Sequence, residues 1–174
     1  HATDLHSTLL QRLDAFSLAH PDFLSVTPED TLSEKDSILI TYPDMLQDST
    51  LLPLKALSTF LERHIADIIS TVHILPFYPY SSDDGFAVID YFEVNPECGT
   101  WEDIQVLGSR FNMMFDAVIN HISSKSTWFE GFIAGEEPYQ EYFKVVQPGV
   151  DLSMVFRPRA SDLLTPVNTK SGEK

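Results

Sequence analysis

Apolar residues recur at helical spacing in the first part of the chain. They lie three or four positions apart, at Leu5, Leu9, Leu13 and Phe16. This period predicts an amphipathic helix that Pro21 ends, and the polar stretch from Pro21 to Asp36 predicts a linker. We therefore expect residues 1–36 to form an N-terminal helical extension and linker, packed against the remainder of the chain.

From residue 37 onward, short apolar runs alternate with helical patterns. The runs suit buried strands and occupy residues 37–42, 71–77 and 113–120. Strands that are apolar on both faces are typical of a parallel sheet. The β-α-β-α-β order therefore predicts a parallel sheet that helices cover on both sides.

Two helices are predicted between these strands. The first begins at Pro53, and its apolar side consists of Leu54, Leu57, Leu61, Ile65 and Ile68. The second covers residues 101–110, where Thr100 is a suitable N-cap and Asp103 lies three residues further on.

The last third of the chain does not continue this alternation. It predicts one helix around Trp128 to Ala134, then irregular sequence rich in Tyr and Phe, then a polar tail. Three parallel strands leave two unpaired sheet edges. We therefore expect residues 37–122 to be the first β/α units of a longer α/β protein, and residues 123–174 to be the start of an inserted subdomain.

Composition and charge exclude several classes of function. The 174 residues and the 43% hydrophobic fraction fit one globular domain, and the net charge of -15 repels phosphate backbones and anionic lipid. We therefore expect neither nucleic-acid nor membrane partners. No apolar run is long enough to span a bilayer, and no signal peptide opens the sequence. One cysteine, Cys98, cannot form an internal disulfide, and the prediction is a cytoplasmic protein.

Polar and aromatic side chains follow two of the predicted strands. They are Asp83, Asp84 and Phe86 after the second strand, and Asp116, Asn120 and His121 at the end of the third. Ligands bind at the carboxyl ends of parallel strands in α/β sheets and barrels. The sequence therefore predicts one polar site with an aromatic floor.

These segments carry a family resemblance. The relevant stretches are ITYPD after the first strand, HILPFYPYSSDDGFAVIDY, DAVINH, and RPR in the inserted region. From about Ile38 to Pro166 the chain resembles the N-terminal part of the α-amylase superfamily of (β/α)8-barrel glycosidases, and within it the sucrose phosphorylase group. SSDDGF, FRPRASDLLTP and the N-terminal extension are more similar to glucosylglycerate or phosphorylated-sucrose phosphorylases. The resemblance implies an α/β fold that is the N-terminal β-α-β-α-β portion of a TIM barrel.

The resemblance also implies roles for three residues. His121 would donate a hydrogen bond to the donor glucose, and Asp83, or Asp84 beside it, would hold the far hydroxyls of that sugar. Phe86 would offer an apolar wall to its C–H face. The alternatives are a buried histidine with a structural partner, an Asx turn before Gly85, and a core aromatic residue.

Other motif residues are expected to be structural. By the resemblance, Asp116 forms structural hydrogen bonds, and Asn120 matches a residue that helps to hold calcium in amylases. Phosphorylases resembling this chain usually lack that calcium, and these side chains supply too few oxygen ligands for it. We therefore predict no metal, and no cofactor. Asp90 and Tyr91 are expected to pack and position the loop.

Two arginines stand out in this acidic chain. Arg157 and Arg159 flank Pro158, and guanidinium groups bind phosphate through paired hydrogen bonds. The resemblance places the second arginine near the acceptor site, so Arg159 is the candidate for phosphate or acceptor binding. The alternative is a salt bridge to one of the surplus acids.

The implied reaction is a retaining double displacement. Phosphate would cleave a sucrose-like or glucosylglycerate-like glucoside and give α-glucose 1-phosphate. The nucleophile and the acid/base would follow residue 174, so this chain holds no catalytic residue and we expect it to be inactive alone. Its partners would be a sugar, inorganic phosphate, and the rest of the barrel or further copies of the chain. The alternatives are part of a hydrolase or transglycosidase of the same fold, and a non-catalytic α/β binding module.

Overall fold

The computed structural model describes residues 2–21, 34, 36–156 and 162–174. The chain divides into two units, His1–Asp36 and Ser37–Lys174. In the first unit, helix α1 (Ala2–Ala19) confirms the predicted helix. Its apolar side is at least half exposed, at Leu5, Leu9, Leu13 and Phe16.

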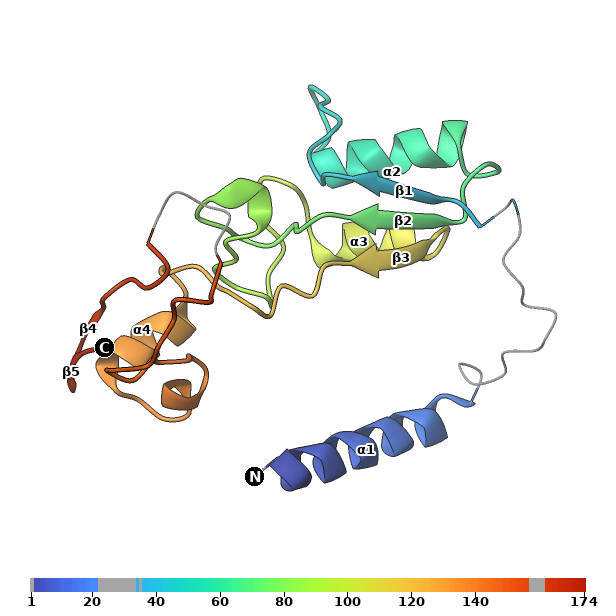
Figure 1. Ribbon diagram of the computed structural model, residues 1–174. Coiled ribbons are helices and arrows are strands. Elements are labelled where there is room, and N and C mark those ends of the chain that lie inside the picture. The colour runs from blue at the N-terminus through green and yellow to red at the C-terminus, as the bar shows by residue number, and fades with distance from the viewer. Residues whose placement is uncertain (1, 22–33, 35, 157–161) are drawn as a thin grey trace. The chain divides into compact units, whose positions relative to one another are not determined.

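The second unit is built on a three-stranded parallel sheet in the order β1-β2-β3. The strands are β1 (Ile38–Thr41), β2 (Thr71–Ile74) and β3 (Asn112–Phe115), and helices α2 (Pro53–His64) and α3 (Trp101–Gly108) connect them. The predicted β-α-β-α-β order is confirmed. The three arrowheads point to the same side, towards the segment that carries α4 (Figure 1). The strands are shorter than expected, so residues 75–77 and 116–120 lie in loops at their carboxyl ends.

The predicted helices on both faces of the sheet are wrong for the described residues. On one face Leu39, Val72 and Ile74 pack in a single core with side chains of both helices, namely Leu54, Leu57, Leu61, Ile104 and Leu107. Within the described residues of the unit Ser37–Lys174, no helix packs on the other face, where Ile38 and Ile40 are 52% and 61% exposed. In a (β/α)8 barrel all helices lie outside and the second face lines the interior, which explains strands that are apolar on both faces.

Local capping decides where the helices begin and end. The expected side chain–backbone pair at α3 is present: Asp103 N–H donates to Thr100 Oγ1 at 3.4 Å, and Thr100 N–H donates to Asp103 Oδ2 at 2.9 Å. Helix α2 ends earlier than predicted, because Ile65 leaves the helical region at φ -139° as its C-cap. Ile68 therefore lies outside the helix and is 66% exposed.

The last segment folds around a third helix of this unit. Helix α4 (Thr127–Ala134) confirms the predicted helix, and the 3-10 helix η3 (Tyr139–Glu141) follows it. The end of the chain forms a hairpin of β4 (Asn168–Thr169) and β5 (Gly172–Glu173), rather than the expected polar tail. Lys170 N–H donates to the Ile133 carbonyl at 2.9 Å, which ties this hairpin to α4. Among the described residues, none of the helices has the length and apolar character to span a membrane.

Candidate functional site

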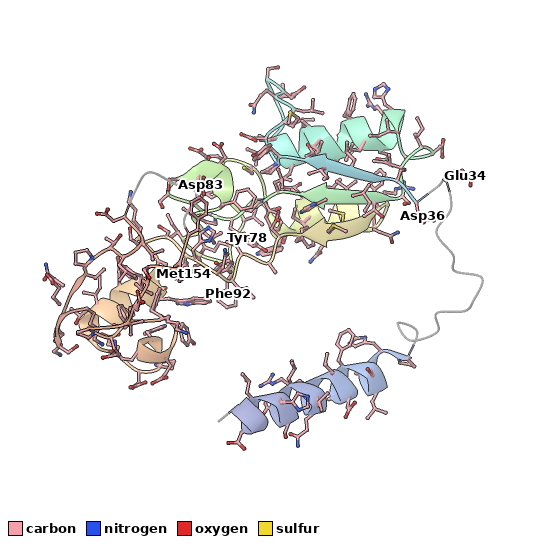
Figure 2. The ribbon with its side chains drawn as sticks, viewed as in Figure 1. Glu34, Asp36, Tyr78, Asp83, Phe92 and Met154 are labelled. Atoms are coloured by element: carbon pink, nitrogen blue, oxygen red, sulfur yellow. The ribbon has the colours of Figure 1, made fainter. Side chains whose placement is uncertain are left out.

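The chain after β2 returns on itself as a hairpin over residues 79–89, the acidic hairpin. Tyr80 and Val88 form an antiparallel bridge, and Ile89 N–H donates to the Pro79 carbonyl at 2.7 Å. The hairpin tip is the 3-10 turn η2 (Asp83–Gly85). Figure 2 shows Tyr78 and Asp83 beyond the carboxyl end of β2.

Three successive residues at this tip have left-handed backbone angles. The φ values are 61° at Asp83, 47° at Asp84 and 100° at Gly85. Aspartate tolerates this region better than most residues, whereas Gly85 also approaches Pro76 so closely that a Cβ would lie 2.6 Å from its carbonyl oxygen. The tip is therefore held in one strained conformation, and such strain is concentrated at functional sites.

Hydrogen bonds tie the acidic hairpin to the segment after β3. Ser123 N–H donates to the Val88 carbonyl at 2.9 Å, and the Ser81 and Ser123 hydroxyls lie 2.7 Å apart. The Tyr91 hydroxyl donates to the Val118 carbonyl at 2.5 Å. The loops that follow β2 and β3 therefore form one framework.

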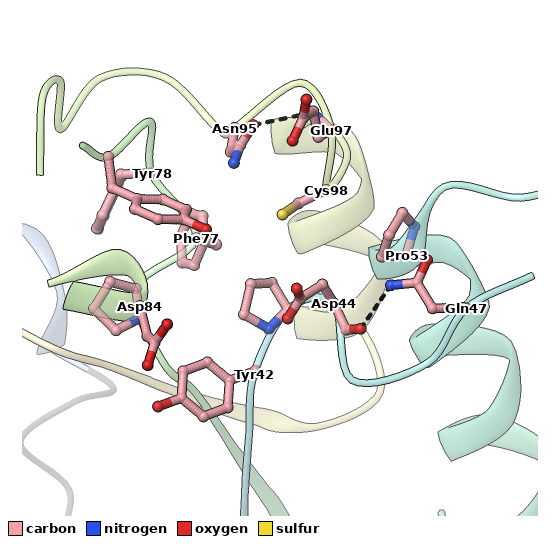
Figure 3. Close-up of a pocket in the computed structure, with 13 residues that line it drawn as sticks. Tyr42, Asp44, Gln47, Pro53, Phe77, Tyr78, Asp84, Asn95, Glu97 and Cys98 are labelled. Atoms are coloured by element: carbon pink, nitrogen blue, oxygen red, sulfur yellow. Dashed lines mark hydrogen bonds between the residues drawn. The ribbon is translucent and has the colours of Figure 1, made fainter. Parts of the chain in front are cut away.

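Two pockets open on this framework, rather than the single site expected. The first, the acidic pocket, has a volume of about 420 Å³ and includes Asp44, Asp84 and Glu97 in its wall. These carboxylates come from three different loop positions around the pocket, with Tyr42 and Tyr78 beside them (Figure 3).

The second pocket, the aromatic pocket, has a volume of about 1240 Å³. A row of ring contacts follows its wall, with centroid distances of 5.6 Å for Tyr78–Tyr91, 5.5 Å for Tyr91–Trp128 and 5.4 Å for Trp128–Tyr142. Tyr78 belongs to both walls, so the two pockets adjoin at its ring.

A carboxylate and two phenols set the polar character of the aromatic pocket. Asp116 Oδ2 lies 3.0 Å from His73 Nε2, and His73 comes from the middle of β2. Burial, and then the charge of Asp116, raises the pKa of Tyr78 above its ordinary value. Burial, and then Tyr78, raises the pKa of Tyr91. Both phenols therefore remain protonated hydrogen-bond donors at neutral pH.

The candidate residues are distributed unequally over the two pockets. The aromatic pocket includes His121, Asn120, Asp116 and Tyr91. Asp84 lines the acidic pocket.

The remaining candidates occupy other positions. Asp83 is exposed at the hairpin tip and Phe86 is half-buried behind it, and neither is in the wall of these two pockets. Asp90 Oδ1 accepts a hydrogen bond from Phe92 N–H at 2.7 Å and closes an Asx turn. Arg159 and its neighbour Arg157 lie outside the described residues.

Several residues of the site were not singled out from the sequence. They are the aromatic side chains Tyr78, Trp128 and Tyr142, with Lys144 beside them. The sequence signals for them were the run PFYPY directly after the second strand and the density of Tyr and Phe between residues 139 and 143. No group of three or more metal-ligating side chains is arranged to hold an ion within residues 2–21, 34, 36–156 and 162–174.

Cys98 is expected to be poorly reactive although it lies in the wall of the acidic pocket. Burial, with smaller contributions from Asp44 and Glu97, raises its pKa to about 11 from 9.0. At about pH 8 its thiolate is then roughly a hundredfold scarcer than that of an ordinary thiol, and the thiolate is the nucleophile. Alkylation by iodoacetamide, followed by mass spectrometry, should be at least that much slower in native buffer than in concentrated guanidinium chloride. Equal rates in the two solutions would contradict the burial of this thiol.

Comparisons with known proteins agree with the α/β fold. Residues 65–170 match the family model of the alpha amylase catalytic domain. The chain is 51% identical to the glucosylglycerate phosphorylase of Allomeiothermus silvanus over 142 residues, which are 82% of this chain and 26% of that protein. It spans about a quarter of the length of the curated relatives it matches.

Solved structures of the same superfamily are also similar. The sucrose 6F-phosphate phosphorylase from Thermoanaerobacter thermosaccharolyticum is 38% identical with a TM-score of 0.55, and the match covers 66% of this chain and 22% of that one. The trehalulose synthase MutB from Pseudomonas mesoacidophila MX-45 is 28% identical with a TM-score of 0.55, and the match covers 64% of this chain and 22% of that one.

Proposed function

Because this chain belongs to the α-amylase family and has the β-α-β-α-β fold of part of its (β/α)8 barrel, we propose that it supplies part of the donor-glucose subsite of a retaining glycoside phosphorylase. The enzyme would use phosphate to cleave a glucosylglycerate-like or sucrose-like glucoside and release α-glucose 1-phosphate. The names of the relatives support this substrate class, since they include glucosylglycerate and sucrose 6F-phosphate phosphorylases.

The observation that carries the proposal is the framework joining the acidic hairpin to the segment of His121. The Ser81–Ser123 and Val88–Ser123 bonds join the chain segment that carries the carboxylates to the segment that carries the imidazole. Carboxylates accept hydrogen bonds from sugar hydroxyls, an imidazole can donate one, and aromatic rings cover the apolar face of a sugar. We assign Asp83, or Asp84 beside it, and His121 to the hydroxyls of the donor glucose.

The remaining roles follow the family pattern. Phe86 would offer an apolar wall to the C–H face of the sugar. Arg159 would bind phosphate or the departing acceptor. A carboxylate nucleophile and an acid/base complete a retaining reaction, and we assign neither role to a residue of this chain.

A binding experiment tests the donor-sugar assignment. We expect D-glucose to bind the chain in ligand-observed NMR, and His121→Ala to weaken that binding about tenfold, because one hydrogen bond to the sugar is lost. His6→Ala, which removes an exposed histidine of α1, is the matched control and should change nothing. Equal glucose affinity of the His121→Ala variant and the unmodified chain would refute the assignment.

A transglycosidase is the second candidate, because the fold is also similar to the trehalulose synthase MutB. The two candidates differ in the acceptor and not in the donor sugar. In a polypeptide that contains the complete barrel, glucosyl release that depends on phosphate supports the phosphorylase, and equal rates without phosphate support the transglycosidase or a hydrolase.

A further inference from the structure

The two adjoining pockets differ in charge. The described wall of the acidic pocket includes Asp44, Asp84 and Glu97 and neither lysine nor arginine. The aromatic pocket includes a lysine, Lys144, and one carboxylate, Asp116. The whole chain has 26 acidic residues against 11 Lys and Arg, so a small anion is repelled from most of this surface.

Lys144, like Lys125, has no salt bridge among the described residues, but unlike Lys125 it lies in the wall of a pocket. Arg110 is paired with Glu62 at 2.8 Å, and Lys174 donates to Gln140 at 3.0 Å. Within the part of the chain that the structure describes, no carboxylate lies within salt-bridge distance of the Lys144 ammonium group. Lys144 is exposed and lines the aromatic pocket, where Asp116 is the one carboxylate of the described wall.

The rest of the aromatic pocket also suits an anion. Its carboxylate, Asp116, is engaged by His73 at 3.0 Å. Hydrogen-bond donors in the same wall are the hydroxyl groups of Ser124 and Thr165. An anion next to Lys144 would therefore meet one cation and two hydroxyl donors.

We propose that Lys144 binds the anionic group of the second substrate, either the oxygens of inorganic phosphate or the carboxylate of a small hydroxy acid. This proposal rests on the glycoside phosphorylase function. The two substrates would bind in regions of different charge. The neutral hydroxyls of the sugar meet the carboxylates of the acidic hairpin, and the anion enters the aromatic pocket.

The test measures the binding affinity of three ligands for four forms of the chain. Inorganic phosphate, D-glycerate and D-glucose are titrated by calorimetry at constant ionic strength into the unmodified chain, Lys144→Gln, Lys144→Arg and Lys125→Gln. We expect Lys144→Gln to weaken anion binding about tenfold or more and to leave glucose unchanged, because a charge-assisted hydrogen bond is lost. Lys144→Arg keeps the charge and should retain anion binding within about threefold.

Lys125→Gln is the control, because Lys125 is exposed and lies outside both pocket walls. Circular dichroism establishes that each variant is folded. Loss of phosphate binding alone identifies phosphate as the ligand, and loss of glycerate binding alone identifies the carboxylate.

Two results overturn the proposal: equal anion affinity in Lys144→Gln and the unmodified chain, or an unmodified chain that binds neither anion. If the anions bind through Lys144 and glucose does not bind, the inference stands and the donor-sugar assignment fails.

Discussion

Replacing Phe77 by alanine is expected to lower the free energy of unfolding by about 3–5 kcal/mol, which is the usual cost of emptying a buried aromatic position. Phe77 is 1% exposed and belongs to the core shared by the sheet and both helices. Its ring meets Trp101 edge-on at 5.6 Å and Phe115 at 5.4 Å. Its carbonyl accepts a hydrogen bond from Asn95 N–H at 2.8 Å, so the residue also orients the wall of the acidic pocket.

Chemical denaturation followed by circular dichroism measures this effect. Phe77→Leu is the matched control, because leucine keeps most of the apolar volume and should cost only about 1–2 kcal/mol. A Phe77→Ala chain that is unfolded in water agrees with the expectation. If Phe77→Ala and Phe77→Leu have the same unfolding midpoint, the expectation is contradicted. The loop that lines the acidic pocket, and not the core, would then determine the packing around the Phe77 ring.

The sequence predicted the elements whose signals are local. The apolar spacing in α1 and α2, and the pair Thr100 and Asp103 before α3, each depend on residues within one or two helical turns. Features that depend on distant contacts were missed. The hairpin of β4 and β5 is stabilised against α4 by Lys170 N–H and the Ile133 carbonyl, and no local pattern marks that contact. The single helical layer follows from the barrel and not from the period of any strand.

In the candidate site, too, residues with a local sequence signal were predicted and those that depend on distant contacts were not. Asp116, Asn120 and His121 were identified because they directly follow a strand, where ligands bind in α/β folds. Tyr78 and Trp128 are 50 residues apart in sequence and meet through Tyr91, which contacts both rings. Such a row of rings arises only when the acidic hairpin is tied to the segment after β3, so it could not be derived from spacing.

Gly85 is the position in the site where the smallest substitution should have a large effect. In Gly85→Ala the new Cβ would lie 2.6 Å from the Pro76 carbonyl oxygen. The backbone φ of 100° is also one that residues with a side chain rarely adopt. We expect a loss of about 2–3 kcal/mol in the free energy of unfolding, because a steric conflict with the backbone adds to the cost of left-handed angles. Relief of the conflict requires movement of the tip that carries Asp83 and Asp84, so glucose binding should weaken in the same variant.

A substitution at Gly149 separates the cost of the left-handed backbone angle from the cost of the steric conflict with Pro76. The φ of Gly149 is also positive, at 87°, and among the described residues other than its chain neighbours no atom lies within 4 Å of a Cβ built there. Gly149→Ala should therefore cost only the backbone term of about 1 kcal/mol, and the difference between the two variants in chemical denaturation measures the contact with Pro76. Equal losses would contradict the close approach. A stable Gly85→Ala chain with unchanged glucose affinity would show that the strained tip does not hold the sugar-binding carboxylates. A loss at Gly85 alone, together with weaker glucose binding, would connect the strain of this turn to recognition of the donor sugar.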